Sequence, residues 1–572
     1  MACSKSIARG FLQRSRKIPS FNQNGLLKQS CRCLTSAEFM KQPTNEPIFE
    51  YRKGSTERQA LEDALNKYRS SVTTVPIVIG DEQLQGLAKQ QVMPFDHSHP
   101  LANYNWASTE QINEAIRVSI ESRNAWDQRP IEERVDVMLR AADLCATKYR
   151  ADLNATTMLG QAKTIVQAEI DAACELIDFL RFNAYNALHL AEYKPISTKE
   201  STNQMIYRAL EGFVAAISPF NFTAIGGNLA SCPAMMGNGV VWKPSDTALL
   251  SNYVTFKILR EAGVPPGVVN FVPADGPVFG EAITSHPSLA AVNFTGSVPT
   301  FRWLWKNVGE RLQRYETFPR LVGECGGKNF HFVHKSADLD TLAATTARAA
   351  FEYQGQKCSA CSRMYVPKSV WPQLKRKLID ITGQLKMGTP LDPSNFVTAV
   401  IDKKAFDRIS SYVAHANTSD HTTVLHGGQC DDTTGYYVQP TIVETTQPND
   451  KLMTEEIFGP VLTVFAYEDA DCEKMLDSVK TATPYGLTGA VFAQDKEFLA
   501  HARARLRDAV GNLYVNDKCT GSIVGQQPFG GARLSGTNDK AGGPHYVLKW
   551  SSPQTIKETH VPLTEWRYPS ME

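Results

Sequence analysis

One cysteine of the chain has the surroundings of a nucleophile. Cys358 lies in the segment Gly355-Gln-Lys-Cys-Ser-Ala-Cys361, beside Lys357 and in a loop that follows a predicted helix. Only about a tenth of an unperturbed thiol is ionised near pH 7.5. A neighbouring cation or a helix end lowers the pKa of a thiol. We therefore expect Cys358 to be a nucleophile with a lowered pKa.

The same segment contains a Cys-x-x-Cys pair, Cys358 and Cys361, which would also suit a zinc or redox site. Structural zinc takes four ligands, and no second pair of cysteines has the spacing to complete such a set. The 12 cysteines show no spacing typical of a disulfide framework either. The sequence thus predicts mostly free thiols and no metal.

Two further side chains could assist a nucleophile. Asn221 follows Ser218-Pro-Phe at the end of a predicted strand, where its amide could stabilise a developing oxyanion. Glu324 lies among glycines in Gly323-Glu-Cys-Gly-Gly327, and its carboxylate could act as a general base. Taken alone, the asparagine could be just a turn residue, and such a glutamate is more often a surface acid.

A nucleotide site is indicated less directly. The chain lacks the Gly-x-Gly-x-x-Gly fingerprint of many dinucleotide-binding sheets. It does have Phe294-Thr-Gly-Ser297 between a predicted strand and a predicted helix, where a glycine lets a phosphate approach the helix amides. Lys243, at the end of the neighbouring predicted strand, could donate a hydrogen bond to a ribose. A Thr-Gly-Ser turn is structural in most proteins, however, and a lysine at a strand end is usually solvated.

The elements that must position these residues alternate between strand and helix. Apolar runs typical of buried strands, at 213–217, 240–242, 268–272 and 291–294, are separated by segments of helical length. This alternation indicates parallel βαβ units and a doubly wound α/β sheet. A second α/β region is expected past Gly323.

Seven short motifs in one order tie these observations together. They are Ser-Pro-Phe-Asn (218–221), Trp-Lys-Pro-Ser (242–245), Phe-Thr-Gly-Ser (294–297), Glu-x-Gly-Gly-Lys (324–328), Gly-Gln-Lys-Cys (355–358), Glu-Glu-Ile-Phe-Gly-Pro (455–460) and Pro-Phe-Gly-Gly (528–531). From about residue 50 to 560 the chain thus resembles the NAD(P)-dependent aldehyde dehydrogenase superfamily.

The resemblance implies an α/β fold with a Rossmann-type NAD-binding domain, an α/β catalytic domain and a small β oligomerisation flap. We expect the NAD-binding domain over residues 35–325, with an arm near 195–209, and the catalytic domain over 326–525. Residues 526–572 would return to the first domain and end in an oligomerisation strand. The arm is predicted to hold two short strands around a polar turn. Exposed strand edges need a partner, which argues for at least a homodimer.

The resemblance also implies a role for each matching residue. Cys358 would be the nucleophile, Asn221 and the Cys358 backbone amide would form the oxyanion hole, and Glu324 would be the base that hydrolyses a thioester. The residues that would hold NAD are Lys243, Ser245, Gly296, Ser297, Val298, Pro299, Thr300, Glu456 and Phe458. The residues that would hold a substrate's carboxylate and cover its methylenes are Ser359, Gly521, Ser522, Phe222 and Phe529.

Three longer segments, 320–330, 356–362 and 520–533, are similar to those superfamily members that oxidise L-glutamate γ-semialdehyde to L-glutamate in proline catabolism. This aldehyde is in equilibrium with pyrroline-5-carboxylate, and NAD is the cofactor that the resemblance implies.

One position departs from the pattern. Ser245 stands where NAD-preferring members commonly carry a glutamate that grips the ribose hydroxyls, and a small hydroxyl there leaves space for the 2′-phosphate of NADP.

The N-terminus differs in composition from the rest of the chain. No acidic residue occurs before Glu38, and residues 1–34 hold seven lysines and arginines. Without them, 53 basic residues would face 59 acidic ones, and the net charge would fall from +1 to −6. Such a segment is typical of a mitochondrial transit peptide, so we expect residues 1–34 to direct the chain to the mitochondrial matrix. The alternative is a merely disordered basic tail.

Composition excludes several other classes. The balance of 60 basic and 59 acidic residues gives no indication of nucleic-acid binding. The stretch 212–242 has no charged residue, but its prolines, asparagines and glycines argue against a membrane span and for a buried strand, loop and helix. A cysteine hydrolase or acyltransferase without a nicotinamide, and an inactive protein on this fold, are the alternatives to a dehydrogenase. The nucleotide-binding features argue against the first and the intact Cys358, Glu324 and Asn221 against the second.

Overall fold

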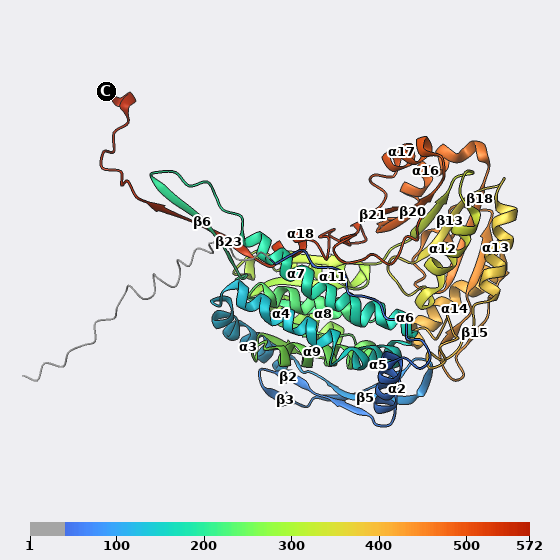
Figure 1. Cartoon of the computed structure of the whole chain (residues 1–572), viewed down its shortest axis with the longest axis horizontal. Helices are drawn as coiled ribbons and strands as arrows, with labels where there is room; N and C mark the ends of the chain where they lie inside the picture. Colours follow the sequence, from blue (N-terminus) through green and yellow to red (C-terminus); the bar gives the residue numbers. More distant parts are fainter. Residues whose placement is uncertain (1–39) are drawn as a thin grey trace, which may run out of the picture. The chain divides into compact units, whose positions relative to one another are not determined.

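The computed structural model of the chain describes residues 40–572, so the predicted targeting segment 1–34 lies outside the described residues. Residues 42–572 form one compact unit, and two seven-stranded sheets organise it (Figure 1). Both sheets are mostly parallel and carry helices on both faces. The α/β class expected from the sequence is therefore confirmed.

The first sheet has the order β11-β10-β7-β8-β9-β2-β3. Its strands from β11 to β9 are parallel, and the last two, β2 and β3, are antiparallel to their neighbours. The chain runs from β7 outward through β8 to β9, then crosses back to β10 and β11 on the other side of β7. The strands are β11 (Arg320–Glu324), β10 (Leu289–Thr295), β7 (Phe213–Ile217), β8 (Gly239–Lys243), β9 (Val269–Phe271), β2 (Ile77–Ile79) and β3 (Glu82–Leu84).

Helices cover both faces of this sheet because alternate strand residues are apolar on both sides. On one face, Phe213 and Ala215 of β7 pack in a core with α3, α10 and α11. On the other, α8 lies against β7 and β8, with α4, α7 and α9 around it (Figure 1). These helices are α3 (Thr109–Asp127), α10 (Gly276–Ser285), α11 (Val298–Glu310), α4 (Ile131–Ala146), α7 (Leu176–Ala191), α8 (Thr223–Met235) and α9 (Leu249–Ala262). The charge-free stretch 212–242 is thus a buried strand, a loop, a buried helix and a strand, as predicted.

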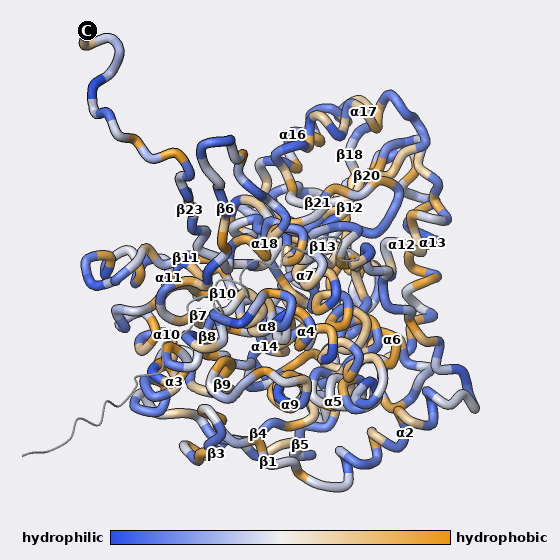
Figure 2. Tube along the Cα trace, turned by 60° about the vertical axis from the view of Figure 1, so that its left-hand side comes forward, coloured by the Kyte–Doolittle hydropathy of each residue, from blue (hydrophilic) through white to orange (hydrophobic). Residues whose placement is uncertain are grey.

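The second sheet has the order β14-β17-β18-β13-β12-β20-β21, parallel except for β14. Helices α12 (Leu339–Phe351) and α13 (Trp371–Gly383) share a core with one face, and α16 (Cys472–Thr481) and α17 (Lys496–Arg505) with the other. Figure 2 shows apolar and polar stretches alternating along α13, whose buried residues recur three to four positions apart. The strands are β14 (Thr422–His426), β17 (Thr441–Thr445), β18 (Val461–Tyr467), β13 (Cys361–Pro367), β12 (Asn329–Val333), β20 (Thr488–Phe492) and β21 (Asn512–Val515).

The first sheet ends at Glu324 and the second begins at Asn329, close to the predicted boundary at 325/326. The division into domains remains a prediction. Three strands on either side of β2 and β3 in the sequence form a third sheet, in the order β1-β5-β4 (Thr73–Val75, Asp96–Trp106 and Leu87–Met93). None of the helices between residues 40 and 572 combines the length and apolarity needed to cross a bilayer.

The predicted arm is built differently from expectation. Residues 195–209 contain one strand, β6 (Ser201–Arg208), and not two around a turn. Its antiparallel partner is β23 (Ser552–Thr559), near the C-terminus, paired over all eight residues of each strand. The two strands form a narrow ribbon that leaves the body of the unit (Figure 1). A partner 350 residues away leaves no local signal, which is why the sequence suggested a hairpin.

A π-helical segment interrupts the helix that leads into α7. Residues Glu169–Glu175 follow α6 (Ile165–Ala168) and continue into α7 without a break. The apolar spacing over residues 168–190 predicts a helix and gives no sign of this interruption. Glu169 at its start is wholly buried and accepts hydrogen bonds from the Phe49 amide (3.0 Å) and the Tyr51 hydroxyl (2.7 Å). Arg150 forms an ion pair with the same carboxylate. The segment around residues 46–51 is thereby held against the helices.

Burial would raise the pKa of Glu169, but hydrogen bonds from Arg150 and from the Phe49 amide outweigh it and lower the pKa. Glu169→Gln keeps the shape of the side chain and removes its negative charge, so that the buried positive charge of Arg150 loses one of its carboxylate partners. We expect the free energy of unfolding near neutral pH to fall by about 3 kcal/mol, measured by urea titration. Because an acid with a lowered pKa stabilises the fold only above its unfolded pKa, this difference should shrink as pH falls through the folded pKa. Glu50→Gln, at an exposed ion pair with Arg52, should change nothing; equal effects would contradict the role of burial.

Candidate functional site

The carboxyl ends of three neighbouring strands lie at one level. In the register of the first sheet, Ile217 of β7 is paired with Phe294 of β10 on one side and with Lys243 of β8 on the other. Glu324, the last residue of β11, is paired with Thr295. Successive strands are added on one side of β7 as far as β9 and on its other side from β10 onward. Ligands of open α/β sheets bind at such a switch point, outside the carboxyl ends of the strands. The candidate residues from four separate motifs therefore lie along one edge.

The loop that carries Cys358 has an unusual backbone. Tyr353 and Gln354 take positive φ angles of 52° and 54°, in a short turn that ends at Gly355. A Cβ at Gly355 would stand 2.2 Å from the carbonyl oxygen of Gly459, so the turn requires glycine there. Asn329, at the start of β12, donates through Nδ2 to the carbonyl oxygens of Cys358 (2.7 Å) and Ala360 (2.9 Å). The nucleophile loop is thus clamped onto the second sheet.

Asn221 lies against the same loop. Its side chain is 4% exposed, and its Nδ2 donates to the carbonyl oxygen of Gln356 at 3.0 Å. An amide nitrogen carries two hydrogens. One fixes the side chain beside the residue two positions before Cys358, and the other can donate to an oxyanion formed on a substrate bound there.

The expected lowering of the Cys358 pKa is not found. Burial raises the pKa of the thiol, and the charges of Glu324, Glu456 and Glu175 raise it further. The sequence prediction relied on Lys357, but its Nζ forms an ion pair with Glu352 at 3.1 Å and is itself buried. A cation already paired with a carboxylate attracts a thiolate only weakly. Cys358 is therefore a thiol at rest and needs a base.

The pKa of Glu324 is raised for a related reason. Burial raises its pKa well above the usual range, and the negative charge of Asp539 adds to the effect. Lys540 and the amide of Gly531 act in the opposite direction without cancelling it. Its buried Oε2 has no hydrogen-bond partner in the structure. Because Glu324 and Cys358 repel each other when both are charged, the site favours one negative charge at a time.

A cavity of about 290 Å³ joins these groups to the predicted substrate residues. Seven residues that the sequence assigned to the reaction or the substrate line it: Phe222, Glu324, Cys358, Ser359, Gly521, Ser522 and Phe529. Asn221 and the predicted NAD-binding residues do not line it. The fold thus brings the predicted nucleophile, the predicted base and the predicted substrate loop around one cavity.

The loop from Cys519 to Val524 forms one end of the cavity. Gly521 has a φ of +79°, a conformation that favours glycine. The hydroxyl of Ser359 shares a hydrogen bond of 2.7 Å with that of Thr520, which fastens this loop to the nucleophile loop. From outside, Asn45 donates to the carbonyl oxygen of Val524 and to Asp178, both at 2.8 Å. Hydroxyls and backbone amides are the donors that this loop offers to a ligand.

Charged side chains that the sequence analysis missed also line the cavity. Asp171 accepts hydrogen bonds from the amides of Thr223 and Ala224, both at 3.0 Å, and so caps α8 directly after Phe222. It also pairs with Lys163, whose Nζ lies 4.1 Å from the centre of the Phe222 ring. Glu175 faces the cavity from the π-helical segment, and burial raises its pKa. Only the fold places these residues, distant in sequence, beside Phe222.

The residues predicted to hold NAD lie at the strand ends. Ser297 caps α11 by accepting a hydrogen bond from the Thr300 amide at 3.4 Å, and both are exposed. Within residues 40–572, Lys243 hydrogen-bonds only the carbonyl oxygen of Pro244 (3.3 Å) and forms no ion pair, and burial lowers its pKa. An exposed helix N-terminus suits a phosphate, and a lysine without a carboxylate partner can donate to ribose hydroxyls. The residues present therefore fit a dinucleotide.

Glu456 and Phe458 come from the loop between α15 (Lys451–Thr454) and β18, on the second sheet. Glu456 accepts a hydrogen bond from the Gly327 amide at 2.9 Å, and burial raises its pKa. The Phe458 ring meets Phe220 edge-on, with centroids 5.8 Å apart. The loop thus packs against the segments that carry Glu324 and Asn221, and its contact with NAD remains a prediction.

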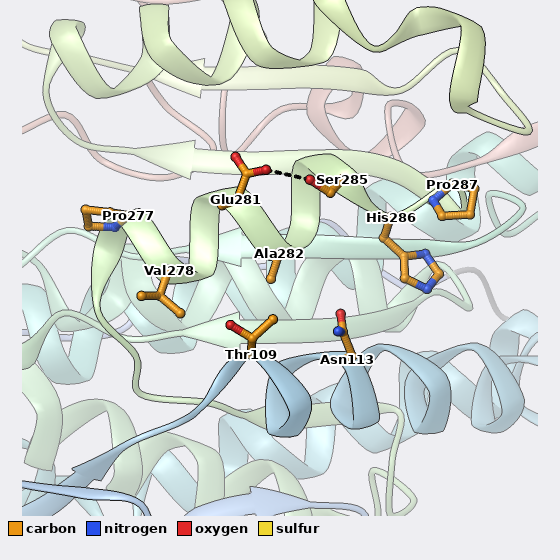
Figure 3. A pocket seen from close by; sticks show the side chains of 9 residues that line it. All are labelled: Thr109, Asn113, Pro277, Val278, Glu281, Ala282, Ser285, His286 and Pro287. Atoms are coloured by element: carbon orange, nitrogen blue, oxygen red, sulfur yellow. Dashed lines mark hydrogen bonds between the residues drawn. The ribbon is translucent and has the colours of Figure 1, made fainter.

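A second cavity, of about 730 Å³, lies between α3 and α10 (Figure 3). In Figure 3 the side chains of Thr109, Asn113 and Ala282 face one another across it. It is lined mostly by apolar atoms and contains none of the predicted catalytic residues. The chemistry therefore belongs to the smaller cavity.

Comparisons with known proteins agree with this geometry. Delta-1-pyrroline-5-carboxylate dehydrogenase, mitochondrial, from Danio rerio is 56% identical over 529 residues, which cover 92% of this chain and 95% of that protein. The human protein of the same name is 56% identical over 530 residues, 92% of this chain and 94% of its own. The Delta-pyrroline-5-carboxylate dehydrogenase from Mycobacterium tuberculosis, crystallised with NAD, superposes with a TM-score of 0.90 at 44% identity, covering 94% of this chain and all of that one.

The model of the aldehyde dehydrogenase family matches residues 85–556. This span contains all seven motifs and every candidate site residue discussed above, from Asn221 to Phe529. The chain therefore belongs to the aldehyde dehydrogenase family.

Proposed function

We propose that the chain oxidises L-glutamate γ-semialdehyde, the open form of pyrroline-5-carboxylate, to L-glutamate with NAD, as a step of proline catabolism. The observation that carries the proposal is the single cavity in which Cys358 and Glu324 face a loop of neutral donors, Thr520 to Ser522. The names of the relatives, 56% identical over most of the chain, support this substrate, and NAD in the mycobacterial structure supports this cofactor.

In the first half of the reaction, the Cys358 thiol transfers its proton to a water molecule as its sulfur adds to the aldehyde carbon, and the oxygen of the carbonyl becomes an oxyanion. The Asn221 amide and the Cys358 backbone amide donate to that oxygen; one such donor contributes about 3–4 kcal/mol in comparable sites. NAD, when bound, supplies a hydride acceptor for the collapse to a thioester. Lys243, Ser245, the segment 296–300, Glu456 and Phe458 would hold it.

In the second half, Glu324 removes a proton from the water that hydrolyses the thioester on Cys358. A buried carboxylic acid has no use as a base until it ionises, so its raised pKa sets a pH below which this step is slow. Phe222 and Phe529 cover the methylenes of the substrate and keep other water out of the cavity.

The substrate's other end carries a carboxylate, which needs donors when it is buried. Gly521 and Ser522 supply two backbone amides and a hydroxyl, and the Ser359 hydroxyl adds a fourth donor. Turns with several amides bind anions without a cation. The ammonium group on the same carbon would face the buried acids of the cavity, of which Glu175 is one.

Initial rates of NADH formation test the function directly. Pyrroline-5-carboxylate should give a higher kcat/KM than propanal, butanal or pentanal, each measured with NAD and with NADP. Turnover with NADP would be allowed by the small Ser245 but should be slower than with NAD. Esterase activity without any NADH formation would instead indicate a cysteine hydrolase.

We infer that the chain works in the mitochondrial matrix. The relatives are named mitochondrial, and the acid-free, basic residues 1–34 have the composition of a matrix-targeting segment. Resistance of the imported chain to protease in mitochondria stripped of their outer membrane would support the matrix, and digestion would contradict it.

We further propose a homodimer formed through the β6–β23 ribbon. Among the described residues 40–572, each of the two strands is paired along one edge only, and Ile206 and Ile556, which pair with Gln554 and Gln204, are more than a third exposed. An exposed strand edge can pair with a second chain. Ile206→Asp with Ile556→Asp should yield monomers in sedimentation velocity; a wild-type chain that is itself monomeric would refute the proposal.

Glu324→Gln should separate the two halves of the reaction. The variant should still release a burst of NADH in the first turnover, because thioester formation does not need the base for hydrolysis, and should lose most of the steady-state rate. Stopped-flow fluorescence of NADH measures both. Cys358→Ala should lose the burst as well, whereas Cys472→Ala, a half-buried thiol outside the cavity, should keep both. Equal loss of burst and steady state in Glu324→Gln would place Glu324 in activating Cys358.

The steady-state rate should rise with pH as Glu324 loses its proton. Asp539→Asn removes the negative charge that contributes to the raised pKa of Glu324, so the acid side of the kcat profile should move to lower pH. A profile that stays in place would show that another group limits the rate.

Ser522→Ala should reduce kcat/KM for glutamate semialdehyde by about 1–3 kcal/mol, the usual cost of a buried group left without its partner. The loss for pentanal, an uncharged aldehyde of the same chain length, should be far smaller. Ser478→Ala, on α16 away from the cavity, controls for the loss of a hydroxyl. Equal losses with both aldehydes would mean that Ser522 shapes the loop and does not contact the carboxylate.

A further inference from the structure

Three buried side chains from separate segments meet next to the nucleophile loop. His331 of β12, Cys361 of β13 and Cys519, which follows β21, are 0%, 1% and 0% exposed. The atoms through which they could ligate a metal lie within 4.8 Å of one another, the one such group of histidine, cysteine and acidic residues in the part of the chain that the structure describes. None of the three lines the substrate cavity. We propose that they bind a structural Zn²⁺ ion.

The hydrogen bond between His331 and Thr346 prepares the histidine as a ligand. Its Nδ1 lies 2.9 Å from the hydroxyl oxygen of Thr346, and its Nε2 accepts a hydrogen bond from the backbone amide of Cys519 at 3.4 Å. When Nδ1–H donates to Thr346, Nε2 carries the lone pair, and a bound ion would replace the Cys519 amide as the partner of that lone pair. Histidines that ligate zinc commonly have their second nitrogen fixed by such an outer hydrogen bond.

The two thiols complete a set that zinc prefers. Zn²⁺ binds thiolate sulfur at about 2.3 Å and imidazole nitrogen at about 2.0–2.1 Å, so ligand atoms around it stand about 3.5–3.8 Å apart. The present atoms need to approach by about 1 Å at most. Two thiolates cancel the charge of the ion, so the cluster is neutral in the apolar core that contains Cys361 and Cys519.

A backbone oxygen is placed to complete the coordination. The carbonyl oxygen of Ser359 lies 3.4 Å from the sulfur of Cys519. It can become the fourth ligand of a tetrahedral ion, which four-coordinate structural sites require. The ion would then connect four points of the chain: β12, the start of β13, the residue after Cys358 and the residue before Thr520.

The position of the ion gives it a structural role in the site. Ser359 belongs to the nucleophile loop, and Cys519 begins the loop that we propose to bind the substrate carboxylate. These two loops are already linked through the hydrogen bond between the side chains of Ser359 and Thr520. A metal whose binding energy adds to folding would fix the distance between the attacking sulfur and the carboxylate-binding donors.

Zinc was not expected from the sequence, because no second pair of closely spaced cysteines accompanies Cys358 and Cys361. Cys361 and Cys519 are 158 positions apart, and the histidine comes 30 positions before Cys361. No spacing rule detects such a set, and only the order of strands in the second sheet assembles it.

The test uses the full chain with Cys358→Ala, so that the catalytic thiol cannot bind the metal. After equilibration with Zn²⁺ and removal of free metal, mass spectrometry of the metal content should find one Zn²⁺ per chain. Adding Cys519→Ser should lower the occupancy at the same free Zn²⁺ at least about tenfold, whereas adding Cys472→Ser should not. Thr346→Val, which removes only the outer hydrogen bond, should weaken Zn²⁺ binding about 10–100-fold.

Co²⁺ in place of Zn²⁺ gives a second readout, since thiolate ligation produces an intense charge-transfer absorption that Cys519→Ser should abolish. This readout and Thr346→Val keep the test decisive if a cysteine variant fails to fold. The proposal is overturned if the Cys358→Ala chain binds no Zn²⁺ or if the Cys519→Ser variant binds as much. It is also overturned if intact mass shows that Cys361 and Cys519 have lost two hydrogens to a disulfide in chains free of metal.

Discussion

The register of the first sheet is the constraint on which the site depends. Since β10, β7 and β8 end at one level, three loops that leave the sheet at widely separated points of the sequence open onto the same edge. A shift of one strand by a single residue would turn its alternate side chains to the opposite face and would move its loop away from the others. The alternate packing of apolar residues against helices on both faces prevents such a shift.

Burial then determines the protonation state of the reacting groups. Cys358 and Glu324 have raised pKa values chiefly because both are removed from water. The paired carboxylate of Glu352 leaves Lys357 little influence on the thiol. A thiol whose pKa is raised is protected from the side reactions of a free thiolate, since the thiolate and not the thiol reacts readily with oxidants. As a consequence, the steady-state rate depends on pH.

The sequence predicted most of the first sheet, the helices between its strands and the residues at its strand ends, because each is encoded locally, for example by apolar runs of strand length and by Ser297 before α11. It could not predict what depends on distant partners. The pairing of β6 with β23, the clamp from Asn329 and the cap from Asp171 all join segments far apart in the chain. The direction of the Cys358 pKa was wrong for the same reason, since neither burial nor the partner of Lys357 can be read from neighbouring residues.

The π-helical segment between α6 and α7 has a consequence for how this chain can vary. Glu169 at its start holds the segment around residues 46–51, while Asp171 and Glu175 within it face the cavity. One residue more than an α-helix would need is accommodated there. Loss of a single residue would restore a regular helix and rotate everything on one side of it by about 100°, separating Glu169 from its partners or the two acids from the cavity. This stretch therefore tolerates substitutions more readily than insertions or deletions. Its length should change less during evolution than the identity of its residues.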